Sequence, residues 1–160
     1  MACKVKLDNG QIWKQDYLTI GQKVAMLESL FSAANALAMA GWAALLIWPR
    51  QHIVHWWLCG ITLPGLLAAA YLGLVVTALP GASGGFSSLS GVAALFSSPW
   101  LLLAGWLHYL AFDLFIGAWM CRRLTAEGLP RWYLLPSLPL TFLLGPVGLL
   151  TFLALRGARA

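Results

Sequence analysis

Long apolar segments alternate with short polar or proline-containing connections along most of this 160-residue chain. Four of these segments are long enough to cross about 30 Å of hydrocarbon as helices that rise about 1.5 Å per residue. They cover residues 29–48, 56–79, 100–121 and 133–155. The pattern therefore predicts an all-α integral membrane protein, with a bundle of four transmembrane helices in residues 27–160 and a short amphipathic, interfacial arm in residues 1–26.

Composition agrees with this membrane class and excludes several soluble activities. Hydrophobic residues make up 61% of the chain and charged residues only 9%, far from the usual composition of soluble domains. No P-loop or HExxH motif is present, so nucleotide hydrolysis and zinc-dependent proteolysis have no support. The first 25 residues lack the apolar core of a secretory signal peptide and do not resemble an organelle transit peptide. We therefore expect them to be a mature cytosolic or interfacial arm.

The ten Lys and Arg residues lie mainly near the ends of the expected spans. Anchoring at the membrane surface explains this placement better than a nucleic-acid interface, so no nucleic-acid partner is expected. Four spans would put both termini on one side of the membrane and the two short loops, residues 49–55 and 122–132, on the other. Aromatic residues mark the short-loop boundary, as in an aromatic belt: Trp48, Trp56, Trp57, Trp119, Trp132 and Tyr133.

The remaining candidates for metal or redox chemistry are weak. His52 and His55 form an HxxH pair without further ligands nearby, so interfacial histidines are favoured over a metal site, and no metal is expected. Cys59 and Cys121 have no CxxC spacing, and free, buried thiols are the favoured interpretation.

One acidic residue, Asp113, lies inside the apolar run of the third expected span. A carboxylate at helix-centre depth costs roughly 2.5 to 3.5 kcal/mol on insertion scales, so a retained one usually faces protein or water. Two interpretations remain open: a satisfied polar anchor between spans, or a neutral acid that donates a proton to an apolar substrate. His108, five residues earlier, lies about 140° away around an ideal helix, so a direct pair is not expected. It is a candidate proton relay, pigment ligand or packing donor.

Other polar and aromatic residues extend this candidate site. Trp106 and Tyr109 precede Asp113 by seven and four residues and share its helix face, so the Tyr109 hydroxyl is expected to contact the carboxyl group. Asn35, in the first span, is either interhelical glue or a partner of Asp113. Tyr71, in the second span, is expected to satisfy local carbonyls or neighbours. Together Asn35, Trp106, Tyr109 and Tyr71 are the candidate residues for binding a substrate or pigment.

The fourth expected span contains Pro136, Pro139 and the sequence GPVG at residues 145–148. Each proline frees a backbone carbonyl, so this helix is expected to be bent and packed against partners. Bent helices with small residues leave grooves between spans. A groove in a bilayer suits a long apolar ligand.

The third expected span carries a family resemblance. The segment SSPWLLLAGWLHYLAFDLFIGAW, residues 97–119, resembles the abscisic-acid-deficient-4-like membrane family, whose plant members are linked to neoxanthin synthesis. The resemblance extends to LFSAANALAMAGWAALLIWPR at the front and LLGPVGLLTFLALR at the end. It implies a four-helix membrane protein that binds or acts on carotenoids. In the plant branch the proposed conversion of violaxanthin to neoxanthin opens an epoxide and forms an allene. Applied to this chain, Asp113 would be the acid and His108 a base or relay, with Asn35 and Tyr109 orienting them.

Three classes of function follow from these observations. The first is an accessory subunit of a larger complex, such as a photosynthetic pigment-protein assembly, in a bacterial inner or photosynthetic membrane or a thylakoid. It would hold carotenoid or lipid as a bound ligand, with no certain cofactor, and Trp13 and Tyr17 of the arm would contact other membrane protein subunits. The alternative is a xanthophyll isomerase of the neoxanthin-forming type. The third class, a small channel or transporter, rests only on a lone acid without an internal repeat.

Overall fold

The structure is a computed structural model that describes the backbone of residues 9–158 and the side chains of residues 20–158. It is helical throughout this part of the chain, with no strand among the described residues. The long elements are α1 (Asn9–Ile47), a π-helix η1 (Ile53–Thr62) that runs on into α2 (Leu63–Ala78), and α4 (Pro99–Ala126). Three helical segments are long and apolar enough to cross a membrane: Ile20–Ile47, Ile53–Gly81 and Pro99–Ala126.

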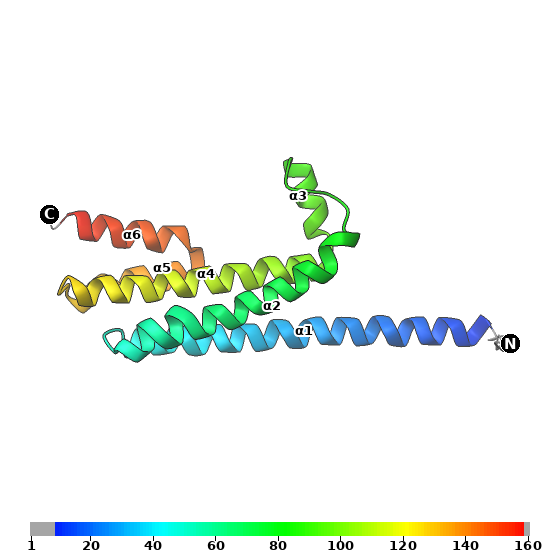
Figure 1. Cartoon of the computed structure of the whole chain (residues 1–160), viewed down its shortest axis with the longest axis horizontal. Helices are drawn as coiled ribbons and strands as arrows, with labels where there is room; N and C mark the ends of the chain where they lie inside the picture. Colours follow the sequence, from blue (N-terminus) through cyan, green and yellow to red (C-terminus); the bar gives the residue numbers. More distant parts are fainter. Residues whose placement is uncertain (1–8, 159–160) are drawn as a thin grey trace.

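Helix α1 continues without a break from the expected arm into the first span. Its 39 residues give a length of about 58 Å, nearly twice the thickness of a hydrocarbon core. Figure 1 shows its N-terminal part projecting beyond the other helices. The backbone of Trp13 and Tyr17 belongs to this projecting part, while their side chains and residues 1–8 lie outside the described part of the structure.

The second span begins with the π-helix η1. A side chain of α4 stabilises this helix by a hydrogen bond to its backbone. Arg122 donates from Nη1 to the His55 carbonyl oxygen at 2.6 Å. A Cβ on Gly60 would lie 2.6 Å from that Nη1 atom and 2.7 Å from the same carbonyl oxygen. Glycine is therefore required at residue 60 for the guanidinium group to reach the π-helix backbone.

The connection to α4 is a short turn, η2 (Leu79–Gly81), followed by the helix α3 (Leu89–Phe96). Ser88 caps α3 by accepting a hydrogen bond from the Gly91 amide at 3.0 Å. In Figure 1, α3 stands apart from the long helices, at the end where α2 finishes and α4 begins.

The expected fourth span is where the structure differs most from the sequence prediction. Residues 131–157 form a short turn, η3 (Arg131–Tyr133), and two helices, α5 (Leu134–Leu144) and α6 (Pro146–Gly157). Gly145 between them has φ +44°, and Pro146 cannot continue α5 because it has no N–H group. The chain therefore turns back on itself. The prediction of one continuous helix over 133–155 is wrong, because the glycine and proline reverse the chain where only a bend was expected.

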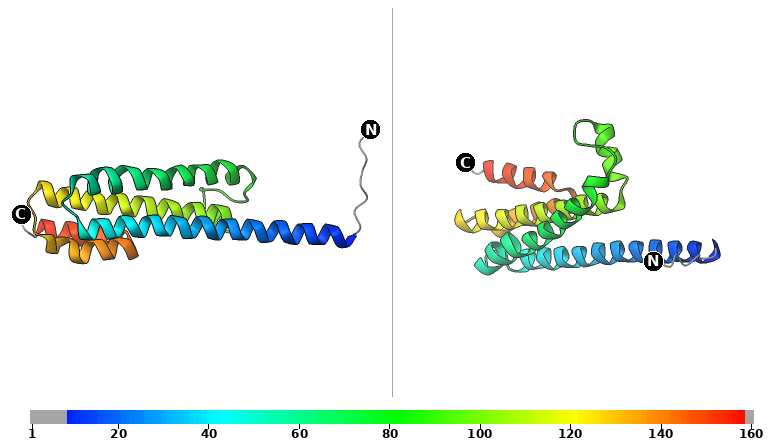
Figure 2. Two further views of the ribbon diagram at one scale, coloured as in Figure 1. Left: turned by 90° about the horizontal axis from the view of Figure 1, so that it is seen from below. Right: turned by 45° about the vertical axis from the view of Figure 1, so that its right-hand side comes forward.

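The two helices of this hairpin lie side by side, as both views in Figure 2 and the view in Figure 1 show. Gly148 of α6 rests on the backbone of Thr141 and on the Ser137 carbonyl group, where any side chain at 148 would collide with α5. At the far end of α6, Arg156 Nε pairs with Glu127 Oε2 at 2.6 Å, next to the end of α4. The hairpin thus brings the C-terminal end of α6 to the short loops, at the opposite end of the bundle from the N-terminal end of α1. The prediction placed both termini on one side.

Helix α4 is the centre of the bundle and contacts α1, η1, α2, α3 and α5. The fully buried Leu114 of α4 packs against Gly41 of α1. The Trp42 indole of α1 lies directly against Gly117 of α4. Small residues thus let α1 and α4 approach closely, as in many membrane helix pairs. Cys59 and Cys121 are buried and free, as expected.

Candidate functional site

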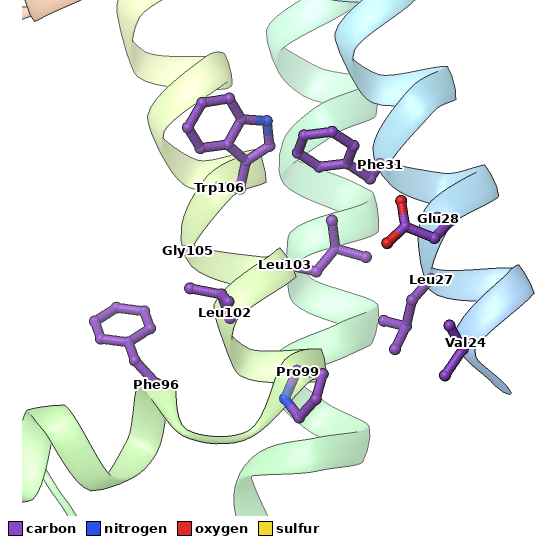
Figure 3. Close-up of a pocket in the computed structure, with 10 residues that line it drawn as sticks. All are labelled: Val24, Leu27, Glu28, Phe31, Phe96, Pro99, Leu102, Leu103, Gly105 and Trp106. Atoms are coloured by element: carbon purple, nitrogen blue, oxygen red, sulfur yellow. The ribbon is translucent and has the colours of Figure 1, made fainter. Parts of the chain in front are cut away.

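A groove of about 850 Å³ lies between α1 and the corner where α3 meets α4 (Figure 3). Its size falls within the usual range for small-molecule sites, about 300 to 1,000 Å³. Among the described side chains that line it, Glu28 is the one charged residue. The lining residues are Val24, Leu27, Glu28, Phe31, Phe96, Pro99, Leu102, Leu103, Gly105 and Trp106. The groove is therefore suited to an apolar ligand.

The α3–α4 corner builds one wall of this groove. Pro99 opens α4 at a position where its missing N–H group costs nothing. One turn and a half later, Gly105 leaves room for the Phe96 ring, which lies 2.6 Å from where a Cβ on residue 105 would be. The Phe96 ring of α3 therefore lies against α4, and Figure 3 shows it beside Leu102 and Gly105.

Trp106 and Asn35 close the groove toward the middle of the bundle. Trp106 donates from Nε1 to Asn35 Oδ1 at 3.1 Å, which joins α4 to α1. Asn35 in turn donates from Nδ2 to the Phe31 carbonyl at 3.0 Å, and the Phe31 and Trp106 ring centroids are 5.8 Å apart. Asn35 thus links two helices, in agreement with its interpretation as interhelical glue. Its hydrogen bonds do not reach Asp113.

Asn35, Trp106 and Tyr109 form a row of neighbouring side chains, in which the Trp106 and Tyr109 ring centroids are 5.4 Å apart. The Tyr109 hydroxyl donates to the Phe142 carbonyl of α5 at 3.1 Å. In an α-helix this carbonyl would accept from residue 146, but Pro146 has no N–H group. Tyr109 therefore satisfies the carbonyl that the proline leaves free. The hydroxyl also lies within electrostatic reach of the Asp113 carboxyl, so the two residues are neighbours, as their spacing predicts.

Asp113 faces the elbow of the α5–α6 hairpin. Its Oδ1 and Oδ2 atoms lie 3.0 and 3.2 Å from the position of a Cβ on Gly145. Gly145 is the N-cap of α6, and a carboxylate near a helix N-terminus is stabilised by the helix dipole. Oδ2 is buried without a hydrogen-bond partner among the described residues. The carboxyl group therefore lies against the elbow and has unused hydrogen-bonding capacity.

His108 and Tyr71 lie apart from this row. The His108 ring stacks on Phe112 with centroids 4.6 Å apart and lies 5.6 Å from the ring of Tyr71 on α2. His108 is exposed on the outside of the bundle. His108 and Asp113 thus do not form a pair, in agreement with the prediction from their spacing. The candidate residues fall into two groups. Asn35, Trp106, Tyr109 and Asp113 follow the groove and the hairpin, while His108 is exposed and Tyr71 is half-buried beside it.

Sequence reasoning missed several residues that shape these sites. Phe96 and Gly105 were not singled out, although a glycine preceding Trp106 in an apolar helix is a signal for close packing. At Gly145 the sequence predicts only a bend, whereas this residue is where the chain reverses. Among the side chains described here, no three His, Cys, Asp or Glu residues gather in a way that could hold a metal ion.

Comparison with known proteins gives one match. No curated protein and no solved structure matches the chain. A family model described as ABA DEFICIENT 4-like matches residues 29–152, which run from the first span to α6 and include the groove's Trp106, the hairpin and Asp113. Since this match covers well over half of the sequence, the chain belongs to the ABA DEFICIENT 4-like family.

Proposed function

We propose that this protein binds a carotenoid, or an apolar ligand of similar shape, within the membrane, in the groove between α1 and α4. The observation that carries the proposal is the groove itself, which is lined almost wholly by carbon and lies on segments apolar enough to cross a membrane. The linkage of plant members of the family to neoxanthin synthesis favours a carotenoid among long apolar ligands.

The lining offers specific contacts for such a ligand. A polyene is long, flat and rigid, so it loses little conformational entropy on binding. The rings of Phe31, Phe96 and Trp106 provide flat surfaces against which it can pack. The Glu28 carboxylate, on the α1 wall, is an acceptor for the hydroxyl group of a xanthophyll end ring.

The test is to fill the groove without disturbing the core. Leu102 lines the groove and is 57% exposed, so Leu102→Trp adds bulk there at little cost to folding. Leu72→Trp on α2 is the matched control, because Leu72 is 58% exposed and lies outside the groove lining. Both variants are produced in carotenoid-making cells and purified, and the pigment absorbance per protein is measured. A lower ratio for Leu102→Trp alone supports the proposal, and equal ratios for all three proteins contradict it.

We further propose that the ligand-binding protein is an accessory subunit of a larger membrane complex. The projecting part of α1, which includes Trp13 and Tyr17, would be the docking element for other membrane subunits. Its support is the continuous helix that reaches beyond the rest of the bundle (Figure 1). Deleting residues 1–19 leaves the segment Ile20–Ile47 intact. Co-purifying subunits in gentle detergent should then disappear, whereas unchanged co-purification would remove this role.

A second candidate function is isomerisation of a xanthophyll epoxide, favoured by the unpaired, buried Oδ2 of Asp113. The acid would protonate the epoxide oxygen as its C–O bond breaks, and a base would remove a proton from the adjacent carbon to form the allene. His108 lies on another side of α4, so the Asp113 carboxylate itself would accept that proton. The reaction is then balanced, with one group acting first as acid and then as base.

This second function has its own test. Asp113→Asn keeps the size of the side chain but removes its acidity, so conversion of violaxanthin to neoxanthin should fall by about 10² to 10⁴-fold. Pigment binding by the same variant should persist, since Asp113 is not among the residues lining the groove. Conversion at the wild-type rate would exclude Asp113 as the acid, and absent conversion in the wild type would leave binding as the function.

A further inference from the structure

A second pocket, of about 440 Å³, lies at the other end of α4, where α1 ends and the π-helix begins. Three arginines, two histidines and two tryptophans are among its lining residues: Arg50, Arg122, Arg123, His52, His55, Trp56 and Trp119. Among the side chains that the structure describes, no Asp or Glu lines this pocket. Its walls therefore carry an excess of positive charge.

The arginines keep unused hydrogen-bond donors. Arg50 donates from Nη2 to the Leu129 carbonyl at 3.0 Å, and Arg122 donates from Nη1 to the His55 carbonyl at 2.6 Å. A guanidinium group has five N–H donors, so each has several left. Arg123 is only loosely paired, at 3.7 Å from Glu127, and its side chain is 49% exposed. Arg50 and Arg122 are thus held in place, Arg123 is free to turn toward a ligand, and all three are able to bind an anion.

The tryptophans fix the depth at which these charges lie. The Arg122 guanidinium lies over the Trp56 ring at 4.8 Å, and that of Arg123 lies over the Trp119 ring at 5.8 Å. Tryptophan is enriched at the level of lipid headgroups. Next to the pocket, Ile53 and Trp57 are 68% and 58% exposed, which provides apolar surface for acyl chains.

The geometry points to a binding site for the phosphate group of an anionic phospholipid, and we propose that the pocket holds such a headgroup. A phosphate accepts several hydrogen bonds at once and is bound well by guanidinium forks. Basic pockets between membrane helices bind anionic headgroups in this way. The π-helix assists, because it brings His55 and Trp56 to the pocket and is braced by Arg122, and such helices are common at functional sites.

The experiment uses the full chain in vesicles that contain phosphatidylglycerol and phosphatidylcholine in equal amounts, followed by native mass spectrometry of the lipids retained. We expect phosphatidylglycerol to be enriched on the wild type. Arg123→Gln removes a charge-assisted hydrogen bond to the headgroup, and the enrichment should fall by about tenfold. Arg123→Lys, which keeps the charge, should lose less.

Controls separate this site from general attraction to charge. Lys23→Gln removes the same charge from α1, outside the pocket lining, and should retain the lipid. His52→Gln is a second pocket variant, at an exposed residue, and it should also weaken retention. Equal retention of both lipids, or an equal loss in Lys23→Gln and Arg123→Gln, would overturn the proposal. Release of the lipid by inorganic phosphate at low concentration would assign the pocket to a soluble phosphate and overturn the lipid assignment.

Discussion

The Asp113 carboxyl group of α4 lies directly against the backbone of Gly145, 3.0 Å from the position that a Cβ on that glycine would occupy. The intramembrane acid and the elbow of the C-terminal hairpin are therefore one structural unit. Substitutions at Asp113 and Gly145 are therefore expected to affect one another.

We expect Gly145→Ala to destabilise the hairpin. An alanine at φ +44° costs about 1 to 3 kcal/mol in backbone strain, and its Cβ would press on the Asp113 carboxyl. Gly128→Ala is the matched control, because Gly128 has φ +61° with no atom within 4 Å of its Cβ position. Thermal unfolding in detergent should show a larger loss of stability for Gly145→Ala. Equal losses would mean that Asp113 does not press on the elbow.

Tyr109→Phe should cost about 1 to 3 kcal/mol of stability, because it leaves the Phe142 carbonyl without a partner. Pro146→Ala restores an N–H group at the residue that would pair with this carbonyl if α5 continued past Gly145. In that background the Tyr109→Phe substitution should cost less, and a double-mutant cycle of unfolding free energies measures the difference. Additive effects of the two substitutions would show that the hydroxyl and the proline do not share the carbonyl.

Gly60→Ala should displace Arg122 from the His55 carbonyl, since the new methyl group would occupy the path of the guanidinium. We expect reduced stability and weaker retention of phosphatidylglycerol. Gly73→Ala on α2 is the control, because its Cβ would meet nothing within 4 Å and alanine is the better helix former. It should be neutral or slightly stabilising. Unchanged lipid retention in Gly60→Ala would separate the π-helix from the pocket.

The two chain ends should report opposite sides of the membrane. Three segments that are long and apolar enough to cross a membrane and a hairpin that returns to the end of α4 place the C-terminal end of α6 beside Glu127, away from the N-terminal end of α1. Compartment-sensitive reporters fused to either end should therefore give opposite signals. The same signal from both ends would favour four crossings, with the 133–155 segment extended as a single helix.

The sequence predicted the three long helices because their apolar runs exceed the thickness of a bilayer core. It could not distinguish a bent fourth span from a hairpin, since Gly145 and Pro146 permit both. The choice is made by contacts distant in sequence: Tyr109 with Phe142, and Arg156 with Glu127. Likewise, Asn35 was recognised as an unusual polar residue, but its partner Trp106 lies 71 positions away. Hydropathy carries no information about such pairings.

The position of the hairpin also sets an order of assembly. The partners of the Phe142 carbonyl and of Arg156 belong to α4 and to the residue that caps it. In a chain synthesised from its N-terminus, α4 is in place before the hairpin emerges. The last 25 or so residues thus dock on a helix that has already been synthesised, so the hairpin is the last part of the bundle to form.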